Sequence, residues 1–554
     1  MTGVQTCALP ISQRRAELLA WLDGYRDTVT EVAFFTGWTH PPLPLPMIQE
    51  EAAELADVIP QFKAIGLRAG INHLATMGHL NENLENSLHE PWQRLVDISG
   101  RESAGCYCTA DPRMQQYVAE AYAALARARP DFLWVDDDVR LESHGTEVPF
   151  ACFCERCLAA FAQQTGRTWT REALRAAFNS GTREERLALR RQWLEHNRRY
   201  IVDLLQRIRA AVDSVNPDLP IGMMTGETSY SGYGFARYAE ALAGPRRLEV
   251  MWRPGGGFYA EHWAGGLLHK AHSLGRQTGL LPRAVREIQS EHESFPYQFL
   301  GKSVTIFTAE IAAYIGAGCT GTALNCMGIT SDPFGEYRPY FDGVQRRRPF
   351  YDRLVATFGR SPCAGVWMAF GPDHFAGLMP DGDWFASPAW GSSLAAINEL
   401  AEIGLPLAYE RQGAALTALH GESCLQFSRD ELLRLLAGGV LMDGPALARL
   451  NELGLEEYTG FAVAGIKDRD TLETFTRDAI NGRFPGWHRD CRPSFWPTPA
   501  YLLKPLTPQS RPLAEVVDFT PVNHGPAAGV FENALGGRVA VQGYYPWTML
   551  GSLA

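Results

Sequence analysis

Three consecutive aspartates, Asp136 to Asp138, follow an apolar run at residues 132–135. A buried strand that ends in carboxylates is how a parallel α/β enzyme presents acid and base groups at the carboxyl end of its sheet. Carboxylates this close repel one another, so at least one should have a perturbed pKa. A helix cap or a solvated turn is the alternative. The apolar run before the aspartates and the thiols after them favour a functional site.

Three cysteines, Cys152, Cys154 and Cys157, come next in the pattern C-x-C-x-x-C. With one more thiolate from upstream they could form a closed tetrahedral zinc site. We predict Cys108 as the fourth ligand, with Cys106 as its substitute. Four thiolates leave no open position, so the zinc would be structural and would fix the loop beside the aspartates. Three reduced thiols at a helix start are the alternative, which the compact spacing disfavours.

A second carboxylate set lies in REIQSEHESFPY, residues 286–297. Alternation along a strand places Glu287, Gln289, Glu291 and Glu293 on one face. In a barrel that face points inward, and Glu293 would lie at the catalytic rim. Two carboxylates facing each other from different strands meet the requirement for glycoside hydrolysis, because one protonates the leaving oxygen and the other attacks the anomeric carbon. A salt-bridged surface strand is the alternative, since basic residues lie nearby.

Weaker candidates lie near other predicted strand ends, where they could hydrogen-bond to a sugar or stack on it. Each one alone is equally consistent with packing or capping. They are Trp38, His40, Asn72, His73, His79, Asn81, Arg101, Asp136, Glu227, Trp252, Arg253 and Asn325. The sequence has no G-x-G-x-x-G after its first predicted strand, no P-loop and no H-E-x-x-H, so nucleotide binding and metalloprotease chemistry have no support.

The elements that must position these residues alternate between strand and helix from residue 28 onward, which predicts a parallel sheet. Eight such units over about 330 residues favour a closed (β/α)8 TIM barrel, of the α/β class. The strands are expected at residues 29–37, 69–77, 95–100, 132–135, 218–226, 247–257, 284–297 and 320–328. The barrel is predicted for residues 13–355, a smaller α/β domain for 361–480 and a C-terminal β-domain, cut short at the chain end, for 505–554. Residues 1–12 are interpreted as a non-native leader.

The overall composition is that of an ordinary globular protein of 554 residues. A net charge of −11 argues against nucleic acid and anionic membranes as main partners. No apolar run approaches the ~20 residues that span a bilayer. No signal peptide is visible, which favours a cytoplasmic location, although the native start could be missing.

The motifs resemble those of glycoside hydrolase family 42, the β-galactosidases. W-V-D-D-D followed by C-F-C-E-R-C-L-A-A-F resembles the family's fourth strand and zinc loop. Cys108 in C-T-A-D-P resembles the upstream zinc ligand, and Glu293-Ser-Phe-Pro296 resembles the E-x-x-P of the nucleophile. The segments IAAYIGAGCTGTALN, LLAGGVLMDGPALARLNELG and ENALGGRVAV resemble later parts of the same family. The resemblance covers nearly the whole chain.

The resemblance implies a TIM barrel, a flavodoxin-like trimerisation domain and a small C-terminal β-domain. It implies an exo-acting retaining glycosidase on β-linked sugars, with Asp138 as acid/base and Glu293 as nucleophile. Glu291 is the fallback nucleophile, and Asp137 would orient Asp138 or bind the sugar. It also implies a structural zinc, a homotrimer and a carbohydrate as the partner, with no organic cofactor.

One departure from the family keeps alternatives open: its Asn-Glu pair is Asp137-Asp138 here. A shorter acid changes the carboxylate separation, on which retention or inversion depends. The sugar could instead be a β-mannoside, an α-L-arabinopyranoside or a uronide. A catalytically dead carbohydrate-binding barrel and a zinc hydrolase are the readings from other classes.

Overall fold

The structure is a computed structural model of the chain. It describes residues 2–6, 12–37, 39–142, 147–226, 233–263, 265–295, 301–327, 332–386, 400–401, 404–490 and 499–544. The chain forms two compact units, Met1–Ser361 and Pro362–Ala554, and each is described by itself.

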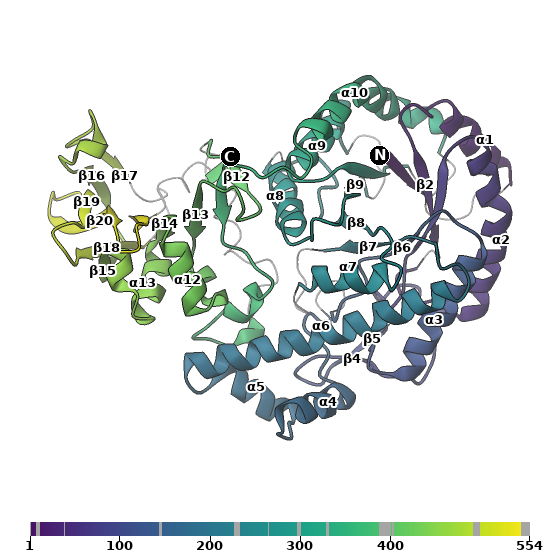
Figure 1. The fold of residues 1–554 in the computed structure, drawn as a ribbon, viewed down its shortest axis with the longest axis horizontal. Helices are drawn as coiled ribbons and strands as arrows, with labels where there is room; N and C mark the ends of the chain where they lie inside the picture. Colours follow the sequence, from purple (N-terminus) through teal and green to yellow (C-terminus); the bar gives the residue numbers. More distant parts are fainter. Residues whose placement is uncertain are drawn as a thin grey trace. The chain divides into compact units, whose positions relative to one another are not determined.

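The first unit is a barrel of parallel strands surrounded by helices (Figure 1). Its sheet has the order β8-β7-β6-β3-β2-β1-β10-β9, and a parallel bridge between Trp252 and Ile288 joins β8 to β9 and closes it. The strands are β1 (Thr2–Thr6), β2 (Glu31–Thr36), β3 (Arg68–His73), β6 (Leu133–Val135), β7 (Ile221–Thr225), β8 (Met251–Pro254), β9 (Gln289–Glu293) and β10 (Gly321–Asn325). This confirms the predicted α/β class with a parallel sheet.

The strand and helix patterns explain this architecture. Every residue of β2, β6, β7 and β8 is buried, as expected for parallel strands covered on both faces. In α2, the buried residues Ile48, Ala52, Leu55, Ile59 and Phe62 recur at helical spacing and form one apolar stripe. The helices are α1 (Ser12–Asp23), α2 (Leu45–Ala64), α3 (Pro112–Arg127), α4 (Glu155–Thr165), α5 (Arg171–Asn179), α6 (Arg183–Asp213), α7 (Phe235–Ala243), α8 (Gly265–Gly279), α9 (Val304–Gly316) and α10 (Arg338–Thr357).

One strand prediction is wrong. The segment 95–100, predicted as the third barrel strand, instead enters an antiparallel hairpin of β4 (Arg94–Val96) and β5 (Glu102–Tyr107) outside the barrel sheet. The chain turns there because Asp97 Oδ1 accepts hydrogen bonds from the backbone N–H groups of Ser99 at 2.8 Å and Arg101 at 2.9 Å. The missing barrel strand is β1, which lies between β2 and β10 and comes from the segment interpreted as a leader.

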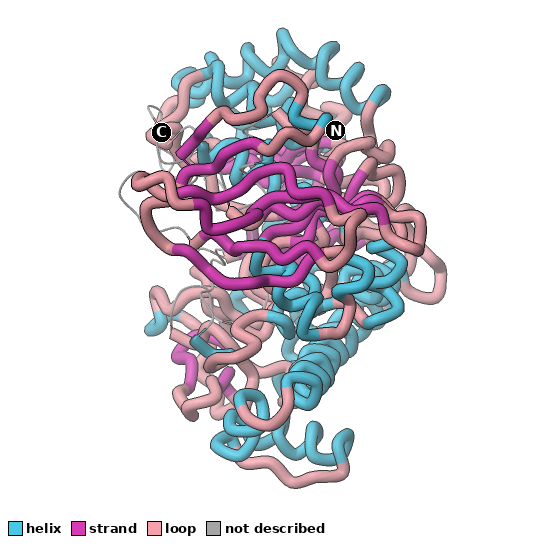
Figure 2. The backbone as a smooth tube through the Cα atoms, turned by 90° about the vertical axis from the view of Figure 1, so that its left-hand side faces the viewer, coloured by secondary structure: helices cyan, strands magenta, loops and turns pink. Residues whose placement is uncertain are grey.

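The second unit is built on one nine-stranded sheet, whose strands lie side by side in Figure 2. Its order is β12-β11-β13-β14-β21-β20-β19-β16-β17, parallel from β12 to β21 and antiparallel beyond. The strands are β11 (Val366–Met368), β12 (Leu407–Ala408), β13 (Leu416–Leu419), β14 (Gly439–Asp443), β16 (Leu472–Phe475), β17 (His488–Asp490), β19 (Arg511–Val517), β20 (Asn523–Glu532) and β21 (Arg538–Gln542).

This sheet joins the two domains that the sequence predicts as separate. β11 to β14 come from the predicted flavodoxin-like domain, whereas β19 to β21 come from the predicted C-terminal β-domain. They are hydrogen-bonded through the β14–β21 pair, so they form a single unit. A smaller antiparallel pair of β15 (Phe461–Lys467) and β18 (Ala500–Pro505) and the helices α12 (Arg429–Leu436), α13 (Gly444–Glu452) and α14 (Glu456–Thr459) complete it.

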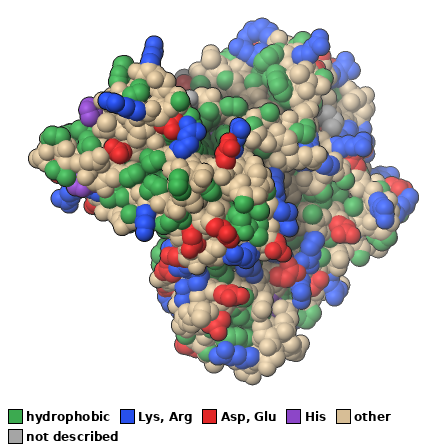
Figure 3. All heavy atoms as spheres, turned by 60° about the vertical axis from the view of Figure 1, so that its left-hand side comes forward, with side chains coloured by type: hydrophobic (Ala, Val, Ile, Leu, Met, Phe, Trp, Pro, Cys, Tyr) green, Lys and Arg blue, Asp and Glu red, His purple; other side chains and the backbone are tan. Residues whose placement is uncertain are grey.

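On the face drawn in Figure 3, acidic and basic side chains are interspersed rather than separated by sign. Within the described ranges, no helix combines the length and the hydropathy needed to cross a bilayer.

Candidate active site

The first carboxylate after β6, Asp136, is tied to two other strands. Asn72 Nδ2 of β3 donates a hydrogen bond to Asp136 Oδ2 at 2.5 Å, and Arg253 Nη1 of β8 donates to Asn72 Oδ1 at 2.8 Å. Burial and the neighbouring charge of Asp137 raise the pKa of Asp136 to about 7. Asp136 is therefore held at the carboxyl end of the barrel, within reach of protonation at neutral pH.

The third carboxylate, Asp138, faces α3. Its Oδ2 accepts hydrogen bonds from the backbone N–H groups of Met77 at 2.6 Å and Gly78 at 2.9 Å. Its charge raises the pKa values of Tyr117 and Tyr122 on α3, and burial raises its own pKa well above the ordinary range. With 1% of its surface exposed, Asp138 is a buried anchor between the β3 loop and α3. The role of Asp138 as the acid/base stays a prediction.

The middle carboxylate, Asp137, lies against two basic side chains. His79 Nε2 lies 3.3 Å from its Oδ1, and Arg140 Nη1 lies 3.3 Å from its Oδ2. Burial is the main cause that raises the pKa of Glu293 and that of Tyr259, and the charge of Asp137 adds to both shifts. Successive side chains point in different directions, so only one of the adjacent Asp137 and Asp138 can face the barrel mouth.

The two carboxylates of β9, Glu291 and Glu293, lie near each other, as the alternation predicts. The Gly256 N–H donates to Glu291 Oε2 at 2.8 Å, and Asn325 Nδ2 of β10 lies 3.5 Å from Glu293 Oε1. A Cβ at Gly255 would lie 3.1 Å from Glu291 Oε2, so the glycine turn after β8 lets the backbone approach this carboxylate. Burial and the Glu291 carboxyl group raise the pKa of Glu293 well above the ordinary range.

Charged side chains behind β9 were missed by the sequence analysis. Lys302 Nζ donates to the Glu293 carbonyl oxygen at 2.7 Å and lies 2.8 Å from Glu310 Oε1. Tyr314 OH donates to Glu310 Oε2 at 3.0 Å. A second buried ammonium, Lys270 of α8, belongs to the same region. These residues lie on helices or before one, away from the strand ends at which sequence reasoning looks for catalytic groups.

Two aromatic side chains flank these carboxylates. Tyr259 and Phe295 are 42% and 54% exposed, and their ring centroids lie 6.1 Å apart. Partial burial and the charge of Glu293 raise the pKa of Tyr259. Tyr259 was missed by the sequence analysis, but it comes directly after the three-glycine turn 255–257 that follows β8, and that turn is a signal that could have found it.

The four predicted thiol ligands lie together. The Sγ atoms of Cys108, Cys152, Cys154 and Cys157 are all within 4.8 Å of one another, and all four residues are buried. Tetrahedral zinc with Zn–S bonds of about 2.3 Å needs sulfur atoms about 3.8 Å apart. The 3.6 Å between Cys108 Sγ and Cys157 Sγ fits that requirement, so this cluster could hold a metal ion. The substitute ligand Cys106 lies outside the cluster.

The comparisons with known proteins are structural, because no protein-family model and no curated sequence matches the chain. A β-galactosidase from Rahnella sp. R3 superposes with a TM-score of 0.65 at 12% identity, covering 100% of this chain and 88% of the other. A GH42 β-galactosidase from G. stearothermophilus gives 0.63 at 11% identity, covering 99% and 87%. The chain has the fold of the family 42 β-galactosidases. An exo-β-1,4-mannosidase from Opitutaceae bacterium strain TAV5 gives 0.52 at 12% identity, covering 100% and 93%.

In this fold, some predicted substrate contacts reach the carboxylates. Asn325 lies 3.5 Å from Glu293, and Asp136 is itself the first of the three carboxylates after β6. His40 lies farther out, paired with Glu82 and with its ring centroid 4.9 Å from that of His79. The His40 and His79 rings therefore continue outward from Asp137.

Other predicted contacts do not reach the site. Trp252 is fully buried, and its Nε1 donates to Thr225 Oγ1 at 3.0 Å, so it belongs to the core. The Arg101 side chain is 53% exposed and pairs with Asp97 on the hairpin outside the barrel sheet. Trp38 and Glu227 lie outside the described residues.

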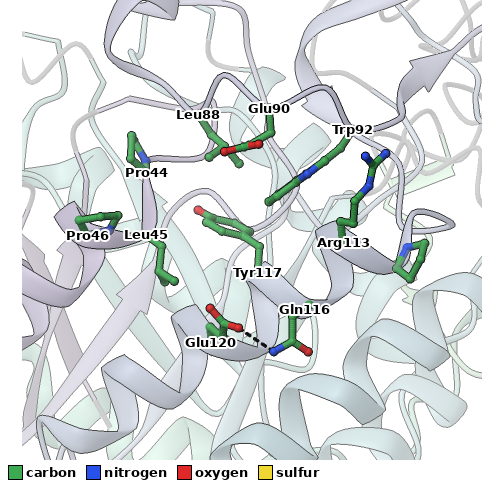
Figure 4. Close-up of a pocket in the computed structure, with 11 residues that line it drawn as sticks. Pro44, Leu45, Pro46, Leu88, Glu90, Trp92, Arg113, Gln116, Tyr117 and Glu120 are labelled. Carbon is green, nitrogen blue, oxygen red and sulfur yellow. Dashed lines mark hydrogen bonds between the residues drawn. The ribbon is translucent and has the colours of Figure 1, made fainter.

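A separate hollow of about 540 Å³ lies at the barrel periphery (Figure 4). It is formed by the start of α2, the loop before β4 and the first turns of α3. Trp92 and Tyr117 form its aromatic wall, with ring centroids 5.8 Å apart. None of the five carboxylates described above lines this hollow, so it is distinct from the candidate active site.

Proposed function

We propose that the protein is an exo-acting, retaining glycoside hydrolase that cleaves β-linked sugars, with a β-galactoside-like substrate. One observation carries the proposal: Asp137 follows β6 and Glu293 ends β9, so the two carboxylates come from different strands at the carboxyl end of one parallel barrel. Two facing carboxylates are what glycoside hydrolysis requires. The exposed rings of Tyr259 and Phe295 beside them offer faces on which a sugar can stack.

In the proposed mechanism, Glu293 is the nucleophile. Its ionised carboxylate attacks the anomeric carbon while Asp137 protonates the leaving oxygen, and Asp137 then activates the water that releases the sugar. Lys302 and Asn325 fix Glu293 through its carbonyl oxygen and its carboxylate. Glu291 is the fallback nucleophile, since it lies on the same face of β9.

Asp137 is favoured over Asp138 as the acid/base because their surroundings differ. Asp138 is buried and held by two backbone N–H groups, whereas Asp137 lies against the basic side chains of His79 and Arg140. His79 and Arg140 then orient Asp137. Asp136 and Asn325 are placed to hydrogen-bond with sugar hydroxyls.

The four-cysteine cluster is proposed to hold a structural zinc, which supplies folding energy rather than chemistry. Val96 N–H donates to Cys152 Sγ at 3.4 Å, so the cluster also connects the β4–β5 hairpin to the loop that follows the aspartates. A homotrimer is proposed from the resemblance to the family alone.

A panel of nitrophenyl glycosides tests the proposal. We expect wild type to cleave one β-glycoside, and Asp137→Ala and Glu293→Ala to lose about a thousandfold or more in turnover. Azide should rescue the two variants with opposite anomeric products, as read by NMR. Cleavage of a β-mannoside instead would follow the fold shared with the mannosidase. Cleavage of no glycoside on a broad panel would favour a carbohydrate-binding barrel, and full activity of Asp137→Ala would return the acid/base role to Asp138.

A further inference from the structure

Lys270 in the second turn of α8 is a buried ammonium. It is 1% exposed, and within the described part of the chain its Nζ has no hydrogen-bond partner. Burying a charge without a partner costs several kcal/mol of folding free energy, of the order of the penalty for one ion of a buried pair. Such a lysine is unusual unless its charge serves another group.

A second buried lysine, Lys302, has partners for its ammonium group, in contrast to Lys270. Lys302 Nζ has the Glu310 carboxylate at 2.8 Å and the Glu293 carbonyl oxygen at 2.7 Å. The other oxygen of Glu310 accepts from Tyr314. Glu310 is thus already paired, and the remaining carboxylate on which the charge of Lys270 acts is Glu293.

The side chain of Lys270 lies beside the glycine turn 255–257 that follows β8. Its Cγ lies 3.8 Å from the position of a Cβ at Gly256, the residue whose N–H holds Glu291. Its Nζ lies 5.5 Å from the centroid of the Tyr314 ring. α8 therefore places a positive charge beside the glycine turn whose Gly256 N–H group holds Glu291.

We propose that Lys270 is a positioning residue of the hydrolytic centre, whose ammonium favours the ionised form of the Glu293 carboxylate, which is the form that attacks. This rests on the proposed function. Lys270 acts through Glu293 and does not touch the sugar. The charged and titratable groups around this region are Glu291, His292 and Glu293 on β9, Lys302 before α9, Glu310 and Tyr314 on α9, and Cys319 after it.

Removal of the Lys270 charge should change the pKa of Glu293 in one direction, upward. A nearby positive charge favours the ionised carboxylate, so removing it raises the pKa of Glu293 further. In Lys270→Met, the acidic limb of the kcat/KM–pH profile should move upward by about one pH unit, and activity below that limb should fall about tenfold. Lys270→Arg should keep the wild-type limb because it keeps the charge.

Lys63→Met is the matched control, because it removes a lysine whose ion pair with Asp131 is partly exposed and remote from β9. Its profile should match that of wild type. A role limited to packing would lower the melting temperature of Lys270→Met without moving the limb. We expect the reverse: a moved limb with a melting temperature equal to or above that of wild type, because an apolar side chain replaces a buried charge. If Lys270→Met does not fold, Lys270→Gln should show the same shift.

A readout without turnover separates this proposal from the proposed function. Infrared difference spectroscopy follows the protonated carboxyl band of Glu293, assigned by its loss in Glu293→Gln. A band that titrates at higher pH in Lys270→Met than in wild type supports the role of Lys270, even if no glycoside is cleaved. A band and an acidic limb that both stay in place would overturn it.

Discussion

The two ends of strand β9 carry acidic residues that have different partners. At its start, Gln289 Nε2 donates to Glu287 Oε1 at 2.8 Å and to Glu31 Oε1 at 2.5 Å. Arg68 Nη1 lies 3.1 Å from Glu31 and 3.3 Å from Glu287. Two buried carboxylates at the amino end of the barrel are therefore bridged by a cation and an amide.

At the other end of the strand, Glu291 accepts a hydrogen bond from the Gly256 N–H group, and Asn325 Nδ2 lies 3.5 Å from Glu293 Oε1. In the described residues, Asp138 Oδ1 has no hydrogen-bond partner. Burial and mutual repulsion raise the pKa values of Asp136, Asp138 and Glu293. In a parallel barrel the amino end serves stability and the carboxyl end serves chemistry. Groups that lack compensation therefore mark the functional end.

Breaking the bridge at the amino end should affect stability alone. Arg68→Met leaves Glu31 and Glu287 as unpaired buried carboxylates, which should cost about 3 kcal/mol of unfolding free energy, at the low end of the range for a broken buried pair because Arg68 is partly exposed. Chemical denaturation measures the loss. Turnover per folded molecule should be unchanged, and a large fall in turnover at full stability would blur the distinction between the two ends.

Removal of one thiol of the four-cysteine cluster should lower stability at the carboxyl end of the barrel. Cys108→Ser deletes one of the four clustered sulfurs, so we expect loss of bound zinc and a drop of about 2 kcal/mol in unfolding free energy. Metal analysis and thermal unfolding check this, with Cys106→Ser as the control because its thiol lies outside the cluster. Chelation that abolished activity while leaving the melting temperature unchanged would instead indicate a catalytic metal.

The smallest expected effect separates Asp138 from Asp137. Because the pKa of Asp138 is raised in the folded state, its contribution to stability is full below its ordinary pKa and is lost as pH rises toward the folded value. Asp138→Asn keeps an oxygen for the two backbone N–H groups but cannot ionise. The free energy of unfolding of the variant should therefore rise relative to that of wild type as the pH rises above about 4. A relative gain that shrinks with rising pH would contradict the buried assignment.

The sequence predicts those features of the fold and the site that depend on residues close together in the chain, and it misses those that depend on contacts between distant segments. The alternation of β9 and the C-x-C-x-x-C spacing are local patterns, and the structure bears out the shared face and the sulfur cluster. Whether Asp137 or Asp138 faces the mouth depends on the N–H groups of Met77 and Gly78, about sixty residues away along the chain. The segment 95–100 has the composition of a strand, and only its Asp97 turn assigns it to a hairpin. The sequence around Lys270 predicts an ordinary helix residue, and only the tertiary structure shows that its side chain is buried.

Trapping of the covalent intermediate tests directly whether Glu293 is the nucleophile. A 2-deoxy-2-fluoro derivative of the cleaved sugar is incubated with wild type, Glu293→Gln and Glu291→Gln, and the labelled peptide is located by mass spectrometry. We expect a label on Glu293 in wild type and in Glu291→Gln, and no label in Glu293→Gln. A label on Glu291, or turnover with inversion and no label, would contradict it.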